Sequence, residues 1–181
     1  MPIKQKKTKE WKRRLKRIKE RERTKAAINA SRERLRERVK NFSSQKDYEL
    51  RIDQSNPQKM SEVIIEYAQP LLDAAQSPQN QRKSIAMAIT FWNIALLSDE
   101  EQKKFIKDFI NTAKAPTNNE EWSGECEQVV TYFIERKTAY YPHINRMILD
   151  FECIETPQGL HLNVVSKEIQ EKADNRKKRQ Q

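Results

Sequence analysis

The sequence contains neither glycine nor proline between Ile3 and Ser55, and this absence limits what the stretch can form. Alanine, arginine, lysine, glutamate and leucine dominate residues 8–41, and these residue types have high helix propensity. Glutamates that precede basic residues by three positions add about 0.2–0.5 kcal/mol per pair to an isolated helix. The five pairs are Glu10–Arg13, Glu20–Arg23, Glu22–Lys25, Glu33–Arg36 and Glu37–Lys40. The stretch therefore predicts one long helix over residues 8–41.

Two apolar clusters lie on different faces of this predicted helix. The clusters are Trp11, Leu15 and Ile18, and then Ile28, Leu35, Val39 and Phe42. We expect the second cluster to dock on the rest of the protein and the first to project. No heptad repeat continues through both clusters, so a self-sufficient coiled coil is not predicted.

Charge is distributed unevenly along the chain, whose total is +10. Residues 1–55 have a net charge of +12, residues 56–166 of −5, and residues 167–181 of +3. A mildly acidic body with basic ends predicts an anionic partner for the basic arm. We expect a basic helical arm and connector over 1–55, a compact helical domain with a C-terminal β-hairpin over 56–166, and a basic tail over 167–181.

Composition narrows the class of protein further. The two cysteines, Cys126 and Cys153, are too few for a disulfide framework and favour a reducing compartment. The first 20 residues hold no uninterrupted apolar core of the kind a signal peptide has. The longest apolar run, residues 85–97, is shorter than the ~20 residues that cross a bilayer. We therefore expect a cytoplasmic protein without membrane insertion.

Four helices are predicted between residues 56 and 142. Their start signals are Asn56 before Pro57, Ser77 before Pro78, and the capping box of Ser98 with Glu101. Pro70 should kink or split the first helix, because proline lacks the backbone N–H that the preceding turn needs. Residues 85–97 are apolar at 11 of 13 positions, which is typical of a helix buried at the centre of a domain.

The last two helices of this body show apolar residues at helical spacing. The third is expected to bury Phe105, Ile106, Phe109, Ile110 and Ala113. The fourth carries Trp122, Cys126, Val129, Val130, Phe133, Ile134 and Tyr140 or Tyr141, and should end at Pro142. Before the body, Tyr48, Leu50 and Ile52 alternate with charged residues, which suits a short edge strand.

Residues 147–165 change to a period of two and predict a β-hairpin. Leu149, Phe151 and Cys153 alternate with other positions, as do Leu160, Leu162 and Val164. A tight turn on Pro157 and Gln158 would pair Cys153 with Leu162 and place both apolar sets on one face. That face should pack on the helices, because a lone hairpin is marginally stable; a longer or bulged connection stays open. A short polar helix capped by Ser166 should follow.

No motif in the chain predicts catalysis. Its two glycines, Gly124 and Gly159, argue against a glycine-rich phosphate loop. The soft metal ligands are Cys126, His143, Cys153 and His161, and their spacing differs from that of zinc sites. His161 should face outward, opposite Cys153, so the two do not form a nucleophilic pair. We expect no enzyme, no metal and no cofactor.

The basic arm is the candidate binding site. Its cations are Lys12, Arg13, Arg14, Lys16, Arg17, Lys19, Arg21 and Arg23. Such density suits phosphate backbones, because each neutralised phosphate releases counterions. Trp11 stands alone, without the aromatic series that stacks single-stranded bases. Favourable interaction with the helix dipole explains the acidic residues near helix starts. An alternative is that they form an intramolecular counter-surface for the arm when no partner is bound. These residues are Asp99, Glu100, Glu101, Glu120, Glu121, Glu125 and Glu127.

The sequence thus predicts a mainly α (α+β) fold of about four helices with a C-terminal β-hairpin and a long basic N-terminal helix. The leading functional hypothesis is a non-enzymatic accessory protein that binds RNA, DNA or a ribosomal particle. The alternative is an interaction or scaffold module that docks on an acidic protein through the anchors Trp11, Leu15 and Ile18.

Overall fold

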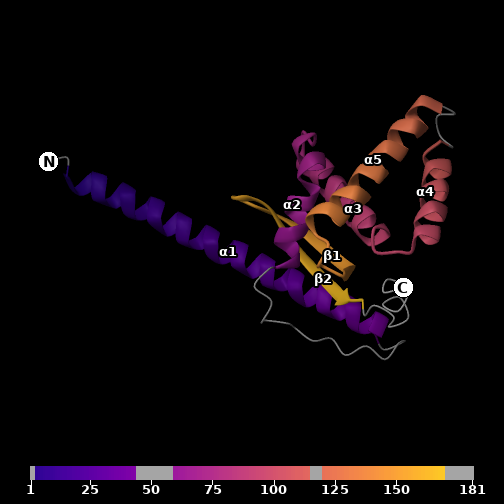
Figure 1. Ribbon diagram of the computed structural model, residues 1–181. Helices are drawn as coiled ribbons and strands as arrows, with labels where there is room; N and C mark the ends of the chain where they lie inside the picture. The colour runs from indigo at the N-terminus through magenta and orange to yellow at the C-terminus, as the bar shows by residue number, and fades with distance from the viewer. Residues whose placement is uncertain (1–2, 44–58, 115–119, 170–181) are drawn as a thin grey trace. The chain divides into compact units, whose positions relative to one another are not determined.

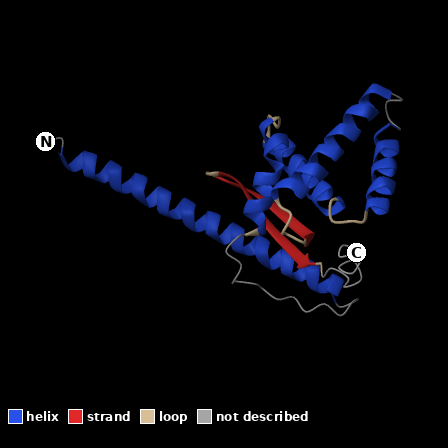
Figure 2. Cartoon of the chain, viewed as in Figure 1, coloured by secondary structure: helices blue, strands red, loops and turns tan. Residues whose placement is uncertain are grey.

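The computed structural model describes residues 3–43, 59–114 and 120–169 (Figure 1). Within these ranges there are five helices and one two-stranded antiparallel sheet (Figure 2). The helices are α1 (Ile3–Ser43), α2 (Met60–Asp73), α3 (Pro78–Ile94), α4 (Asp99–Lys114) and α5 (Glu120–Tyr140). The strands are β1 (Arg146–Thr156) and β2 (Gly159–Glu168). The predicted fold class, including the long N-terminal helix, is confirmed.

The described residues form two compact units. One consists of α1 and the hairpin segment Asp150–Val164, and the other contains α2, α3, α4 and α5 with the remaining parts of both strands. The predicted division into 1–55, 56–166 and 167–181 stays a prediction. The edge strand expected at Tyr48, Leu50 and Ile52 lies outside the described residues.

Tyr67 on α2 is the centre of the core of the helical unit. Its ring meets Trp92, Phe133 and Tyr141 edge-on, with centroids 5.2, 5.2 and 6.0 Å away. Its hydroxyl donates a 2.9 Å hydrogen bond to the carbonyl of Phe133. Edge-on aromatic pairs add about 0.5–1.5 kcal/mol beyond the burial of their area. One tyrosine thus links α2, α3 and α5.

Helix α3 is the buried central helix that residues 85–97 predicted. Its buried residues are Ile85, Ala88, Ile89, Phe91, Trp92 and Ile94. Two of the predicted caps, Ser77 and Ser98 with Glu101, are also confirmed. Ser77 accepts from the backbone N–H of Asn80 at 3.2 Å, and the Glu101 carboxylate accepts from the backbone N–H of Ser98 at 3.0 Å.

Helix α2 differs from its prediction at Pro70. It begins at Met60 after Lys59, and the start expected at Asn56 and Pro57 lies outside the described residues. It also continues unbroken through Pro70 to Asp73. The missing N–H of Pro70 leaves the carbonyl of Glu66 without its helical partner, and Arg136 donates a 3.3 Å hydrogen bond to that carbonyl. A side chain from α5 therefore replaces the bond that proline removes.

Two further expectations are wrong. The apolar stripe of α4 is only partly buried: Phe105 is 37% exposed, and Ile106, Phe109 and Ile110 are intermediate. Helix α4 packs mainly against α5, so one neighbouring helix covers the stripe incompletely. Ser166 does not cap a helix, because β2 continues through it to Glu168 and its hydroxyl accepts from Nε of Arg146 at 3.1 Å.

The hairpin forms with the predicted turn. Strand β1 ends at Thr156 and β2 begins at Gly159, so Pro157 and Gln158 alone connect them. The Thr156 hydroxyl donates to the Gly159 carbonyl at 2.7 Å and accepts from the Gln158 N–H at 3.2 Å. Gly159 has φ of 113°, a left-handed conformation that glycine adopts without steric cost. The two strands are therefore joined by the tight turn on Pro157 and Gln158, and not by the longer or bulged connection that the sequence had left open.

The start of β1 is held by two side chains at the end of α3. The indole N–H of Trp92 donates to the carbonyl of Arg146 at 2.8 Å. The Asn93 amide donates to the carbonyl of Ile148 and accepts from its N–H, both at 2.8 Å. Asn93 thus pairs with β1 as a neighbouring strand would, and satisfies backbone groups that are costly to bury unpaired.

Lys137 is a buried charge within this aromatic core, and the sequence did not predict it. Its side chain is 4% exposed and donates a 2.8 Å hydrogen bond to the carbonyl of Tyr141. Its Nζ lies 4.9 Å from the centroid of the Trp92 ring. Burial lowers the pKa of Lys137, and the carbonyl and the ring offset part of the cost of burying the charge.

We predict that Asn93→Ala lowers the free energy of unfolding by about 2–4 kcal/mol, because two backbone groups of Ile148 lose their partner. Chemical denaturation measures this change. Asn80→Ala, the same substitution at an exposed position of α3, is the control and should change stability by about 0.5 kcal/mol or less. Equal effects of the two substitutions would contradict the role assigned to Asn93.

We predict a pH-dependent stability difference between the wild type and Lys137→Met. Burial lowers the pKa of Lys137 from its ordinary 10.5, so the folded chain releases this proton at a lower pH than the unfolded chain. Between those two pKa values the unfolded chain binds more protons, and stability rises with pH. The unfolding free energy of the wild type minus that of the variant should grow as pH approaches 10.5. A difference independent of pH would rule this out.

Candidate nucleic-acid interface

Helix α1 consists of a half that packs and a half that does not. Ser31, Leu35 and Val39 recur every four residues along one face and are buried. Residues 10–23, by contrast, are all exposed. The expected docking of the second apolar cluster is therefore seen at Leu35 and Val39, with Ile28 half-buried.

A buried asparagine on the hairpin joins α1 to β2. Asn163 is 7% exposed, and its amide donates to the hydroxyl of Ser31 at 2.9 Å. The same amide reaches the carbonyl of Ile28 at 3.5 Å. Its oxygen lies 3.5 Å from the Nε of Arg32. Nearly all of the hydrogen-bonding capacity of Asn163 is thus used on one face of α1.

Two acids of β1 hold two arginines of α1. Arg34 is paired with Glu152, and Arg38 with Asp150 at 2.6 Å and Glu152 at 3.6 Å. The hydrogen bond to Asp150 raises the pKa of Arg38. Arg34 and Arg38 are four residues apart, which is about 6 Å along a helix, and Asp150 and Glu152 are two residues apart, which is about 6.8 Å along a strand. The spacing of the two arginines therefore matches that of the two acids. Such half-exposed pairs contribute about 0.2–1 kcal/mol each and mainly set register.

These contacts correct the expectation for His161 and identify two acidic partners of α1 that were not predicted from the sequence. His161 does not face outward: it is half-buried, and its Nε2 lies 3.2 Å from Oδ1 of Asn163. The polar face of the hairpin is therefore the face that meets α1. Asp150 and Glu152 were not predicted from the sequence as partners of the basic helix. The two acids are two residues apart in a strand and therefore lie on one face of it, and Arg34 and Arg38 are four residues apart in a helix and therefore lie on one face of that helix.

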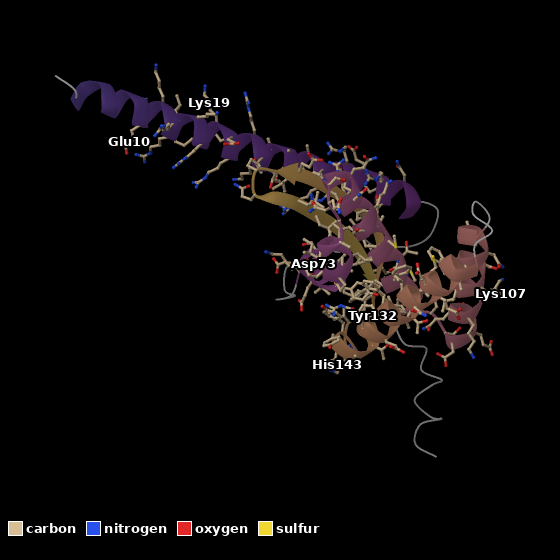
Figure 3. All side chains as sticks on the ribbon, turned by 90° about the horizontal axis from the view of Figure 1, so that it is seen from above. Glu10, Lys19, Asp73, Lys107, Tyr132 and His143 are labelled. Carbon is tan, nitrogen blue, oxygen red and sulfur yellow. The ribbon has the colours of Figure 1, made fainter. Side chains whose placement is uncertain are left out.

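The exposed half of α1 contains all the candidate cations. Lys12, Arg13, Arg14, Lys16, Arg17, Lys19, Arg21 and Arg23 are all exposed. Among the described side chains, none of these eight forms an ion pair with a carboxylate. Figure 3 shows nitrogen-tipped side chains leaving α1 around Lys19. Their positive charge is therefore available to a partner.

Three of the five expected glutamate–cation pairs are absent among the described ion pairs, and these three lie toward the exposed end of α1. Glu33 is paired with Arg36, but Glu10–Arg13, Glu20–Arg23 and Glu22–Lys25 are absent among the described ion pairs. Exposed side chains at this spacing gain little from pairing in water and lose rotamer freedom. The apolar anchors are also uncovered: Trp11 is 59% exposed, and Leu15 and Ile18 are each 40% exposed.

The histidines, cysteines and acidic residues form no metal site among the described residues. Within residues 3–43, 59–114 and 120–169, no group of three histidine, cysteine or acidic side chains could hold a metal ion. No disulfide joins Cys126 to Cys153, and burial raises the pKa of Cys126. In the same ranges, no helix has the length and apolar character needed to cross a membrane.

No protein-family model, curated protein or solved structure matches this chain.

We predict that Asn163→Ala loosens α1 from the hairpin. The buried hydroxyl of Ser31 would lose its partner, which costs about 1–3 kcal/mol. Amide hydrogen exchange of residues 28–39 should accelerate about tenfold or more, while amides of α3 should not change. Gln158→Ala, at the exposed turn, is the control. Unchanged exchange in α1 would show that Asn163 does not hold the helix.

Proposed function

We propose that this protein is a non-enzymatic accessory protein that binds the phosphate backbone of nucleic acid through the exposed half of α1. The observation that carries the proposal is the set of eight exposed cations without described carboxylate partners. Each contact with a phosphate would release condensed counterions, and this release supplies most of the affinity in sequence-independent binding.

The arrangement of α1 supports the proposal in a second way. The hairpin pairs with Arg34 and Arg38 through Glu152 and Asp150 but leaves residues 10–23 uncovered. The packed half gives the helix an ordered continuation before any partner is present. A helix that is already formed loses less conformational entropy on binding than a segment that must fold.

An acidic protein partner is the second candidate function. The exposure of Trp11, Leu15 and Ile18 favours it, because anchors of this kind fill grooves in helix-binding proteins. In that case Trp11→Ala with Leu15→Ala should weaken binding more than charge reversal at Arg13 and Arg14. Nucleic-acid binding predicts the opposite order.

We predict that removing residues 1–24 abolishes binding to nucleic acid and leaves the helical unit folded. The salt dependence of the full chain, measured by fluorescence anisotropy, should show log K falling with log salt at a slope near −5 if about six phosphates are contacted.

The matched control replaces Lys103, Lys104 and Lys107, three exposed cations of α4, with glutamine. This variant should keep the affinity and the salt slope of the wild type, whereas the same change at Arg13, Arg14 and Arg17 should reduce both. Salt-dependent binding that survives removal of residues 1–24 would falsify the proposed function.

A further inference from the structure

The exposed half of α1 carries its cations in two rows on opposite sides of the helix. The first row is Lys12, Lys16, Lys19 and Arg23, and the second row is Arg14, Arg17 and Arg21. At about 100° of rotation per residue, the centres of the two rows lie about 160° apart. The first row lines one shallow depression together with Leu15 and Glu20, and nitrogen-tipped side chains point to both sides of the helix in Figure 3.

The apolar stripe, Trp11, Leu15 and Ile18, lies between these rows, about 100° from each. Its three side chains are exposed. Glu22 continues the line of the stripe beyond Ile18, so the apolar contact surface ends at Ile18. Arg13 and Glu20 lie on the opposite side of the helix. The stripe is therefore flanked symmetrically by positive charge.

We propose that this half of α1 binds in the major groove of B-form duplex DNA, with one cationic row along each phosphate strand and the apolar stripe toward the groove floor. The inference rests on the proposed function and names its substrate class. The major groove is about 12 Å wide and an α-helix with side chains is about 10–12 Å across. Phosphates therefore flank an inserted helix on the two sides where these rows lie.

Other nucleic acids fit this arrangement less well. A single strand that follows one row leaves the other row, on the far side of the helix, without phosphates. The major groove of A-form duplex RNA is deep and narrow and does not admit side chains for readout. A flat anionic surface would likewise meet one side of the helix only. Two opposed rows are best satisfied by two strands.

The dimensions also agree. The first row advances about 17 Å from Lys12 to Arg23 at 1.5 Å per residue, and duplex DNA carries one charge per about 1.7 Å of its axis. The seven cations of the two rows can therefore all reach phosphates. If each neutralises one, log K should fall with log salt at a slope of about −6.

The test compares three probes with the full-length chain by fluorescence anisotropy at several salt concentrations. The probes are a DNA duplex of about two helical turns, an RNA duplex of the same sequence, and the single DNA strand. The variants replace every residue of the first row, or of the second row, with glutamine. The matched control replaces Lys83, Lys103, Lys104 and Lys107, four exposed cations of α3 and α4.

We expect duplex DNA to bind tightest. Neutralising the first row should reduce the steepness of the duplex slope by about 3.6 and neutralising the second row by about 2.7, and each change should lower duplex affinity more than tenfold. The single strand should retain much of its weaker affinity in each row variant, because the other row remains. The control should match the wild type.

Trp11→Ala separates the apolar contact from the charges. It should lower the affinity for duplex DNA about tenfold without changing the salt slope, because an apolar contact releases no counterions. Glu22→Gln should raise duplex affinity, because it removes a negative charge beside the groove floor. Circular dichroism verifies that each variant keeps its helical content.

The outcomes distinguish the two proposals. Equal affinity and slope for all three probes, or tighter binding to the RNA duplex, overturns the groove geometry and leaves the proposed function standing. A row variant that binds duplex DNA like the wild type also overturns the geometry. Failure of the wild type to bind any of the three probes overturns the proposed function itself.

Discussion

Hydrogen bonds to the hairpin hold each of the two units together. In the helical unit, Asn93 pairs with the backbone of Ile148 as a strand would. In the other unit, Asn163 bonds to Ser31 on α1. The side-chain amides of Asn93 and Asn163 are part-buried or buried. In such a site an unpaired backbone or hydroxyl group lowers stability far more than an unpaired group at the surface does. Two asparagines on different elements thus determine where the strands attach, and hydrophobic burial adds stability around them.

The polar hairpin face also determines which charges of α1 are free. Asp150 and Glu152 pair with Arg34 and Arg38, and Asn163 meets Arg32. Residues 10–23 carry eight cations, and none of them forms an ion pair among the described side chains. The chain therefore separates one continuous basic helix into a half that serves the fold and a half that is available for a partner. The proposed DNA contact uses only the second half.

Local signals predicted much of the fold. The helix starts at Ser77 and at Ser98 with Glu101 were predictable because capping depends on residues three positions apart. The hairpin turn between Thr156 and Gly159 was predictable from the local sequence as well. The failures share a cause. Pro70 does not split α2 because Arg136, distant in sequence, bonds to the freed carbonyl of Glu66. Ser166 stays in β2 because Arg146 supplies its partner. No local rule contains these partners.

The sequence by itself determined that residues 10–23 form an exposed basic helix with an apolar stripe, because helix propensity, charge and spacing are all local. It also determined the buried centre at α3. Only the tertiary structure decided that the polar face of the hairpin meets α1, because that choice depends on Asn163, Ser31 and the matched spacing of acids and arginines more than 100 residues apart. Side chains alternate between the two faces of a strand, so the sequence pattern alone does not show which face is covered. The element that packs on the strand determines which face is buried.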